Sequence, residues 1–146
     1  MKKMVIVSLI ILISIALISI IFFFLYWKVY QIPIIGENCS IIVENEGENK
    51  VDIVFFTDGV NKNKLNEYAN FFLSSEPYVN YKKKFNFFYA GAADCKIMGD
   101  FIFCYSKETL KKSSSCPNDY IIVLSNQSSK IRSSSYINLI SLNINN

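Results

Sequence analysis

Histidine is absent from this chain of 146 residues, while tryptophan occurs once, proline three times and glycine five times. Without histidine, the chain cannot form the usual Ser–His or Cys–His pairs of nucleophilic catalysis, or supply imidazole ligands to zinc. The few glycines form no glycine-rich phosphate loop, and the four cysteines include no C-x-x-C pair. The sequence therefore predicts no enzyme, no bound metal and no cofactor.

Charge is absent from a long stretch near the N-terminus. Residues 4–27 contain no charged side chain and consist mainly of Ile, Leu, Val and Phe. As a helix they would span roughly 36 Å, enough to cross a hydrocarbon core of about 30 Å. A cleaved signal peptide has a shorter apolar region followed by small residues, whereas residues 22–28 are bulky. The pattern favours an uncleaved anchor that contacts membrane lipid through residues 4–27.

Positive charge sets the expected orientation of this anchor. Lys2 and Lys3 precede the apolar span, and only Lys28 follows it closely before several glutamates. Because positive segments stay on the cytoplasmic side, the N-terminus should be cytoplasmic and the C-terminal domain outside the plasma membrane. These three lysines account for the whole net charge of +3. The rest of the chain is balanced, so nucleic acid is not an expected partner.

Three parts of the chain follow from these patterns. Residues 1–28 form the cytoplasmic tip and transmembrane anchor, and residues 29–38 form a stalk that contains Pro33. Residues 39–146 have the length of one ordinary domain. We expect a small extracytoplasmic α/β domain with two or three layers and a mixed sheet. Its partner would be an unknown protein or a component of the cell envelope.

The domain is organised around residues 50–60, which read Lys-Val-Asp-Ile-Val-Phe-Phe-Thr-Asp-Gly-Val. An almost wholly apolar run of this length is typical of a strand that is buried on both faces in the centre of an α/β sheet. Residues 61–73 follow with apolar side chains at helical spacing. By the same criteria, residues 85–90 and 119–125 predict two further buried strands.

Shorter elements surround these strands. Residues 39–44 predict a short strand, for which antiparallel pairing with residues 51–57 is plausible across a polar turn. Residues 106–112 predict a short helix with Ser106 as its cap. Residues 136–144 alternate imperfectly and predict a final edge strand.

Cysteine spacing predicts two disulfides, since an even number of cysteines outside the cytosol favours pairing. The Gly-Asp pair at residues 99–100 is a two-residue hairpin signal. With that turn, Cys95 and Cys104 occupy opposite positions that are not hydrogen-bonded, where Cα atoms lie about 4.5 Å apart. We predict a Cys95–Cys104 disulfide, which by elimination leaves Cys39 with Cys116.

Two N-x-S triplets begin at Asn38 and Asn126. They are candidate glycosylation sites in a cell that has the necessary machinery. Because Asn and Ser are common in this chain, such triplets arise readily by chance and carry little weight.

Asp58 ends the central strand directly before a predicted helix, which raises three functional hypotheses. A metal-dependent adhesion site needs hydroxyl ligands where Val60 and Lys62 stand, and is excluded. Phosphate binding at the helix start lacks a glycine-rich loop. Acid–base catalysis would pair Asp58 with Glu76 or Asp94, and nothing in the spacing brings them together. The favoured interpretation is structural: Asp58 belongs to the turn that ends the strand.

Residues 50–126 resemble, in order, the N-terminal half of IgA-peptidase-type zinc metallopeptidases, especially archaeal members. The resemblance rests on four segments: Asp-Ile-Val-Phe-Phe-Thr-Asp-Gly at 52–59, Ser-Glu-Pro-Tyr at 75–78, Tyr-Lys-Lys-Lys-Phe-Asn-Phe at 81–87, and Cys-Pro-Asn-Asp-Tyr-Ile-Ile-Val-Leu at 116–124. These motifs are moderately specific. The resemblance implies that the chain shares the α/β sheet of the family.

That family cleaves peptides with a zinc ion held by an H-E-x-x-H helix, which lies beyond the part matched here. Its two histidines bind the metal and its glutamate acts as the base. This chain has no histidine, so no catalytic residue carries over. The resemblance implies a membrane-anchored, extracytoplasmic, non-catalytic binding or structural module. The alternative is a remnant or subunit of a zinc metallopeptidase that another chain completes.

Overall fold

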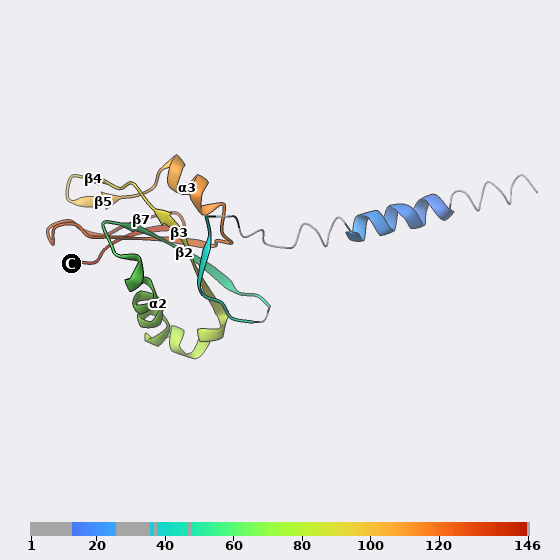
Figure 1. The fold of residues 1–146 in the computed structure, drawn as a ribbon, viewed down its shortest axis with the longest axis horizontal. Helices are drawn as coiled ribbons and strands as arrows, with labels where there is room; N and C mark the ends of the chain where they lie inside the picture. The colour runs from blue at the N-terminus through green and yellow to red at the C-terminus, as the bar shows by residue number, and fades with distance from the viewer. Residues whose placement is uncertain (1–12, 26–35, 37, 47, 146) are drawn as a thin grey trace, which may run out of the picture. The chain divides into compact units, whose positions relative to one another are not determined.

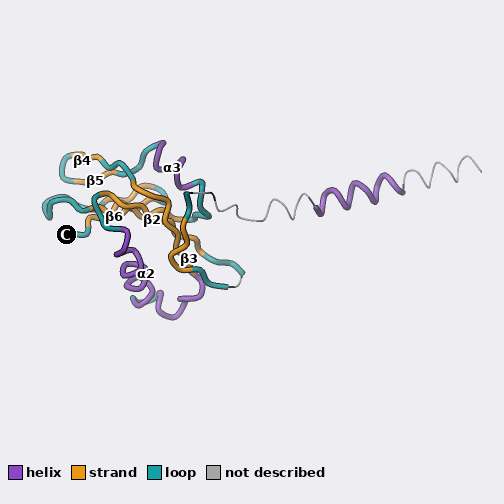
Figure 2. The backbone as a smooth tube through the Cα atoms, viewed as in Figure 1, coloured by secondary structure: helices purple, strands orange, loops and turns teal. Residues whose placement is uncertain are grey.

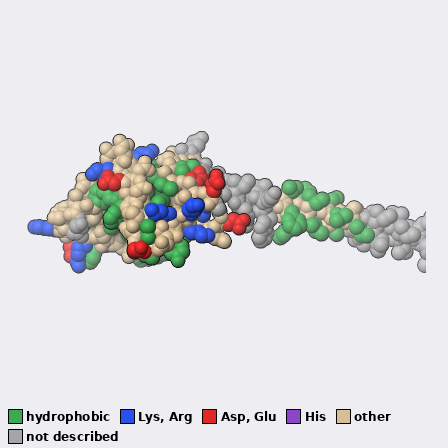
Figure 3. All heavy atoms as spheres, turned by 90° about the horizontal axis from the view of Figure 1, so that it is seen from below, with side chains coloured by type: hydrophobic (Ala, Val, Ile, Leu, Met, Phe, Trp, Pro, Cys, Tyr) green, Lys and Arg blue, Asp and Glu red, His purple; other side chains and the backbone are tan. Residues whose placement is uncertain are grey.

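A computed structural model describes residues 13–25, 36, 38–46 and 48–145. The chain divides into two units, Met1–Pro33 and Ile34–Asn146. In the first unit, residues 13–25 form a helix, and Figure 3 shows mainly hydrophobic side chains on it. No helix within the described residues combines the length and apolar character needed to cross a membrane. The other residues of the predicted anchor, and most of the predicted stalk, lie outside the described residues.

The second unit is built on a six-stranded mixed sheet with the strand order β1-β3-β2-β6-β8-β7 (Figure 1). Its strands are β1 (Ser40–Val43), β2 (Val51–Asp58), β3 (Phe85–Ala92), β6 (Tyr120–Ser125), β7 (Ser134–Tyr136) and β8 (Leu139–Asn143). The four inner strands β3, β2, β6 and β8 are parallel, and the edge strands β1 and β7 are antiparallel to their neighbours. The α/β class with a mixed sheet, predicted from the sequence, is confirmed.

Connecting elements lie on both faces of this sheet (Figures 1 and 2). Between β2 and β3 the chain forms η1 (Lys62–Lys64), α2 (Leu65–Ser74) and η2 (Tyr78–Lys84). Between β3 and β6 it forms β4 (Lys96–Met98), β5 (Phe101–Phe103) and α3 (Lys107–Ser113). Figure 1 shows α2 on one side and α3 with the β4–β5 hairpin on the other. We call these sides the α2 face and the α3 face.

Strand β2 fills both faces, as its apolar run predicts. Val54 and Phe56 are fully buried in a cluster on the α3 face. Ile53 and Phe55 are buried in a second cluster with α2, where the ring of Phe55 stacks on that of Phe87 at 5.6 Å between centroids. Burial on both faces is what places β2 between two parallel neighbours in the centre of the sheet.

Side-chain caps stand at the start of η1 and of α3. The side chain of Asn61 accepts a hydrogen bond from the backbone N–H of Asn63 at 2.9 Å, at the start of η1. Helix α2 continues from η1 and buries Leu65, Ala69 and Leu73 against the sheet. Ser106 caps α3 by accepting a hydrogen bond from the N–H of Thr109 at 3.1 Å, which confirms that prediction.

Two predictions for the ends of the domain are wrong. Strand β1 pairs with β3 and not with residues 51–57, because both edges of the central strand β2 are occupied by β3 and β6. A short, partly exposed strand fits better at the edge. Residues 136–144 are not one edge strand either. The chain reverses at Ile137, which has φ 56°, so that β7 pairs with β8 while β8 also pairs with β6.

Both predicted disulfides are present. The β4–β5 hairpin has the expected register, with Met98 opposite Phe101, and Cys95 and Cys104 are bonded with 4.2 Å between their Cα atoms. Cys39 and Cys116 are bonded with 5.3 Å between their Cα atoms. All four cysteines belong to the cluster on the α3 face. Both disulfides of the domain therefore lie on the α3 face.

Candidate functional site

The carboxyl ends of the parallel strands meet at one edge of the sheet. Ligand sites of α/β sheets form at this edge, where successive connections leave toward opposite faces. Here that point lies between β2 and β6, because the chain continues from β2 to β3 on one side and from β6 to β8 on the other. Asp58, Ser125 and Asn143 end three adjacent strands in register. They form a row of polar side chains at the predicted place.

The row becomes a cluster through Gln127, two residues beyond β6. The Ser125 Oγ donates a hydrogen bond to the Asp58 Oδ2 at 2.5 Å. The Gln127 Nε2 donates to the same Oδ2 at 3.0 Å and lies 3.3 Å from the Ser125 Oγ. We call Asp58, Ser125, Gln127 and Asn143 the carboxyl-edge cluster. One carboxylate oxygen is thus held by two donors from the neighbouring strand and its loop.

Asn143 fixes the loop that follows β6. Its Oδ1 accepts a hydrogen bond from the backbone N–H of Gln127 at 3.2 Å. Its Nδ2 donates to the backbone oxygens of Ser128 and Ile131 at 2.9 and 2.6 Å. The side chain is buried, and each of these bonds replaces one to water. Asn143 therefore holds the loop against the end of the sheet.

The chemistry open to this cluster is narrow. Ser125 is fully buried, so its hydroxyl is out of reach of a substrate in this arrangement although it bonds to a carboxylate. Within the described residues, no group of three or more Cys, Asp or Glu side chains could hold a metal ion. The cluster joins the ends of three strands, which agrees with the structural interpretation of Asp58.

The other residues considered from the sequence lie apart from the cluster. Among the described residues, no hydrogen bond or ion pair joins Glu76 or Asp94 to Asp58. Both candidate glycosylation residues, Asn38 and Asn126, are exposed, and their modification stays a prediction. Asn126 accepts a hydrogen bond from the side chain of Asn145.

Sequence reasoning missed Ser125, Gln127 and Asn143. A usable signal was present for the first two, since polar residues follow directly on the apolar run of β6. Residues just beyond the carboxyl end of a parallel strand are where side chains converge in such sheets. Asn143 carries no comparable signal, because residues 136–144 alternate imperfectly and predict an edge strand, not an inner parallel strand that ends at Asn143.

Comparison with known proteins adds no relative. No protein-family model matches the chain, and no curated protein is similar enough to be counted as a relative. The resemblance of residues 50–126 to a metallopeptidase half-domain stays a prediction. Function has to follow from the geometry of the chain itself.

Proposed function

We propose that the protein is a membrane-anchored, extracytoplasmic, non-catalytic module that binds one helix of a partner chain on the α2 face of its sheet. The uncharged residues 4–27 support the anchor, and the two disulfides support an oxidising compartment outside the cytosol. The binding role rests on four apolar side chains of β6 and β8, which we call the open strip. They are Tyr120, Ile122, Ile140 and Leu142.

The open strip is the part of the α2 face that α2 leaves uncovered. Phe55, Ile122 and Ile140 are neighbours in one row across β2, β6 and β8. Along this row the exposed fraction rises from 2% at Phe55, through the partly buried Ile122, to 38% at Ile140. The apolar layer therefore continues beyond the elements that bury it.

The side-chain pattern of β8 carries the proposal. Ser141 and Asn143 point to the α3 face and are 1% and 3% exposed, whereas Ile140 and Leu142 point to the α2 face and are each 38% exposed. A strand with one wet face normally places its polar residues there. Apart from the buried Leu139, strand β8 does the reverse, although it has hydrogen-bonded neighbours on both sides. Apolar side chains in this position favour burial by something outside the described domain.

The dimensions of the open strip suit one helix. Two adjacent strands occupy about 10 Å of sheet width, and an α-helix with its side chains is about 10–12 Å wide. None of the four side chains of the open strip is charged. The matching surface is thus an apolar stripe along an amphipathic helix, which would lie beside α2 and extend the same layer.

Site-specific photo-crosslinking in native membranes tests this proposal. A photoreactive phenylalanine analogue at Ile140 should give one discrete adduct with another chain. The crosslinked residue of that chain should lie on the apolar side of an amphipathic helix. The same analogue at Phe71, which is 73% exposed on α2, is the matched control and should give none. Leu142→Lys should lower the yield at Ile140 about tenfold or more, because a lysine in an apolar contact is costly.

Other adducts would lead to other conclusions. A photo-adduct between two copies of this chain would contradict a partner helix on the open strip. Equal labelling from Ile140 and Phe71 would contradict it as well. A partner that carries an H-E-x-x-H helix and one bound zinc per complex would favour the alternative, in which this chain is a subunit of a zinc metallopeptidase.

A further inference from the structure

A wide groove opens beside the carboxyl end of β3, and its lining shares no residue with the carboxyl-edge cluster or the open strip. Its volume is about 740 Å³, and its walls come from η1, the beginning of β1, the end of β3 and α3. Ligand sites in proteins have volumes of about 300–1,000 Å³. The charged side chains among its described lining residues are Lys62, Lys111, Lys112 and Glu108.

Lys62 forms one wall, and neutral groups hold it in place. Its Nζ lies 4.9 Å from the centroid of the Tyr89 ring, a cation–π contact, and 3.5 Å from the Ser40 Oγ. Among the described residues, no carboxylate forms an ion pair with it. The charge of Lys62 is thus positioned over the groove without being neutralised.

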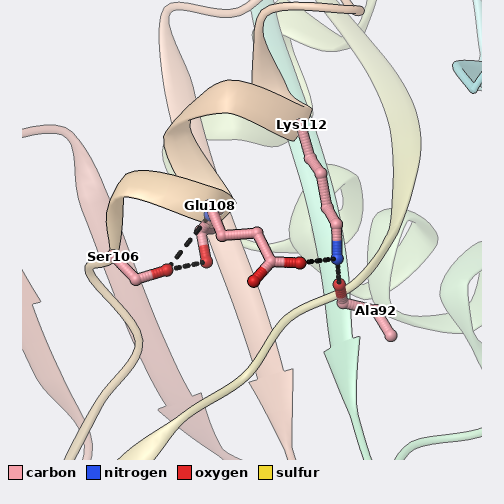
Figure 4. A network of polar contacts seen from close by, with 5 residues as sticks. Ala92, Ser106, Glu108 and Lys112 are labelled. Atoms are coloured by element: carbon pink, nitrogen blue, oxygen red, sulfur yellow. Dashed lines mark hydrogen bonds and ion pairs between the residues drawn. The ribbon is translucent and has the colours of Figure 1, made fainter.

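Helix α3 forms the opposite wall (Figure 4). The Lys112 Nζ lies 3.0 Å from the Glu108 Oε1 and donates a hydrogen bond to the backbone oxygen of Ala92 at 3.1 Å. This pair neutralises Glu108 and ties α3 to the end of β3. The adjacent Lys111 is exposed and forms no ion pair among the described residues. Two of the three lysines therefore remain uncompensated, one on each wall.

The remaining lining is polar or small. Ser40, Ser115 and Tyr89 line the groove together with Ala90, Gly91 and Ala92 of β3. The Ser115 Oγ donates a hydrogen bond to the backbone oxygen of Lys112 at 2.7 Å, so it can still act as an acceptor. Gly91 has φ +111°, and a Cβ there would meet nothing within 4 Å, so the floor is open at this point. The groove therefore offers cations and hydroxyl oxygens beside small apolar surfaces such as those of Ala90 and Ala92. It suits a ligand that carries negative charge and has both hydroxyl groups and small C–H faces, as a charged sugar does.

We propose that this groove binds an acidic carbohydrate, a sugar chain that bears sulfate or carboxylate groups. Lys62 and Lys111 contact its anionic groups from the two walls, while the hydroxyls of the lining bond to those of the sugar. The site shares no residue with the open strip, so its failure would leave the helix-binding proposal untouched.

Titration calorimetry of the full-length protein in detergent micelles tests the site. Dextran sulfate and carboxymethyl dextran should bind, and neutral dextran of the same size should not. The stronger of the two acidic polymers identifies the preferred anionic group. The double variant Lys62→Gln/Lys111→Gln should weaken binding about tenfold, with a smaller effect at high salt. The matched control, Lys82→Gln/Lys83→Gln, removes the same charge from η2, outside the groove lining, and should leave the affinity unchanged.

A gain-of-affinity variant separates this effect from misfolding. Glu108→Gln removes the acidic side chain of the described lining and frees Lys112, so binding of the acidic polymers should become about threefold tighter. Equal weakening by the two lysine double variants would overturn the proposal, because it would show a response to net charge alone. Inorganic sulfate that binds as tightly as dextran sulfate would also overturn it, because the sugar would then contribute nothing.

Discussion

The two faces of the sheet are completed in different ways. On the α3 face a helix, a disulfide-bonded hairpin and the loop after β6 cover the strands out to β8, and even Ser141 is buried there. On the α2 face one helix covers the strands around β2, and Ile140 on β8 stays 38% exposed. The adjacent residues Ile140 and Ser141 of β8 thus lie in opposite environments, one partly exposed and one buried.

The difference shows that burial does not follow polarity on β8, where two polar side chains are buried and two apolar ones are partly exposed. Ser141 is buried because its Oγ accepts a hydrogen bond from the backbone N–H of Cys104 at 3.2 Å, and Asn143 because it bonds to the loop after β6. Burying a polar group costs little when its hydrogen bonds are made. The α3 face therefore buries the polar side chains of β8, whereas the α2 face leaves its apolar side chains Ile140 and Leu142 partly exposed.

Loss of the long-range disulfide should have the largest effect on this comparison. Cys39→Ser/Cys116→Ser opens a link between residues 77 positions apart and should lower the free energy of unfolding by about 4.5 kcal/mol. Cys95→Ser/Cys104→Ser, with a separation of 9, should cost about 2.6 kcal/mol. Urea unfolding followed by circular dichroism measures both. The reverse order would contradict the role assigned to the longer link.

Truncation of a buried ring on the α3 face comes next. Phe56→Ala should lower the free energy of unfolding by about 4 kcal/mol, because Phe56 is fully buried and leaves a cavity. The control Phe71→Ala removes the same group from a side chain that is 73% exposed, and should cost less than about 0.5 kcal/mol. Similar losses in the two variants, measured by urea unfolding, would be incompatible with the burial described.

Removing the buried hydroxyl of Ser141 on β8 tests whether its hydrogen bond is what makes the burial of a polar side chain favourable. Ser141→Ala leaves the N–H of Cys104 buried without its acceptor, and should cost about 1–3 kcal/mol even though alanine is less polar. Ser135→Ala on the exposed edge strand β7 is the control and should be close to neutral. A stabilising Ser141→Ala variant would show that the hydrogen bond has no net value. Thermal unfolding of the two variants in parallel provides the measurement.

The smallest effect is expected on the open strip. Ile140→Ser should lower the free energy of unfolding by less than about 1 kcal/mol, because the side chain is already partly in water. Ile121→Ser, on the neighbouring strand but 1% exposed on the α3 face, should cost about 3 kcal/mol or more. Equal losses in urea unfolding would mean that the α2 face is as closed as the α3 face.

Features that depend on local signals were predictable. The apolar run of β2, the Gly-Asp turn at residues 99–100 and the cap at Ser106 each act within a few residues. The hairpin register followed from the turn, and the Cys95–Cys104 pairing followed from the register. The second disulfide then needed no further information, because two cysteines remained.

Features that depend on partners far away in the sequence could not be predicted. The partner of β1 is decided by which strands occupy the edges of β2, and those strands come later in the chain. The reversal at Ile137 lacks the glycine that usually marks a positive φ. The carboxyl-edge cluster joins residues from three strands, and only the order of those strands brings them together. These features required the topology, which the sequence pattern alone does not determine.

The Cys39–Cys116 disulfide also determines how the domain would respond to mechanical load. In the proposed anchored form, tension reaches the domain from its N-terminal side at Cys39, just before β1. The covalent link passes that tension directly to Cys116, so the chain from residue 40 to residue 115 carries none of it. That shielded stretch contains β2, α2 and α3. Under oxidising conditions, pulling can therefore extend directly only β6, β7, β8 and their loops, while residues 40–115 stay closed by the covalent link.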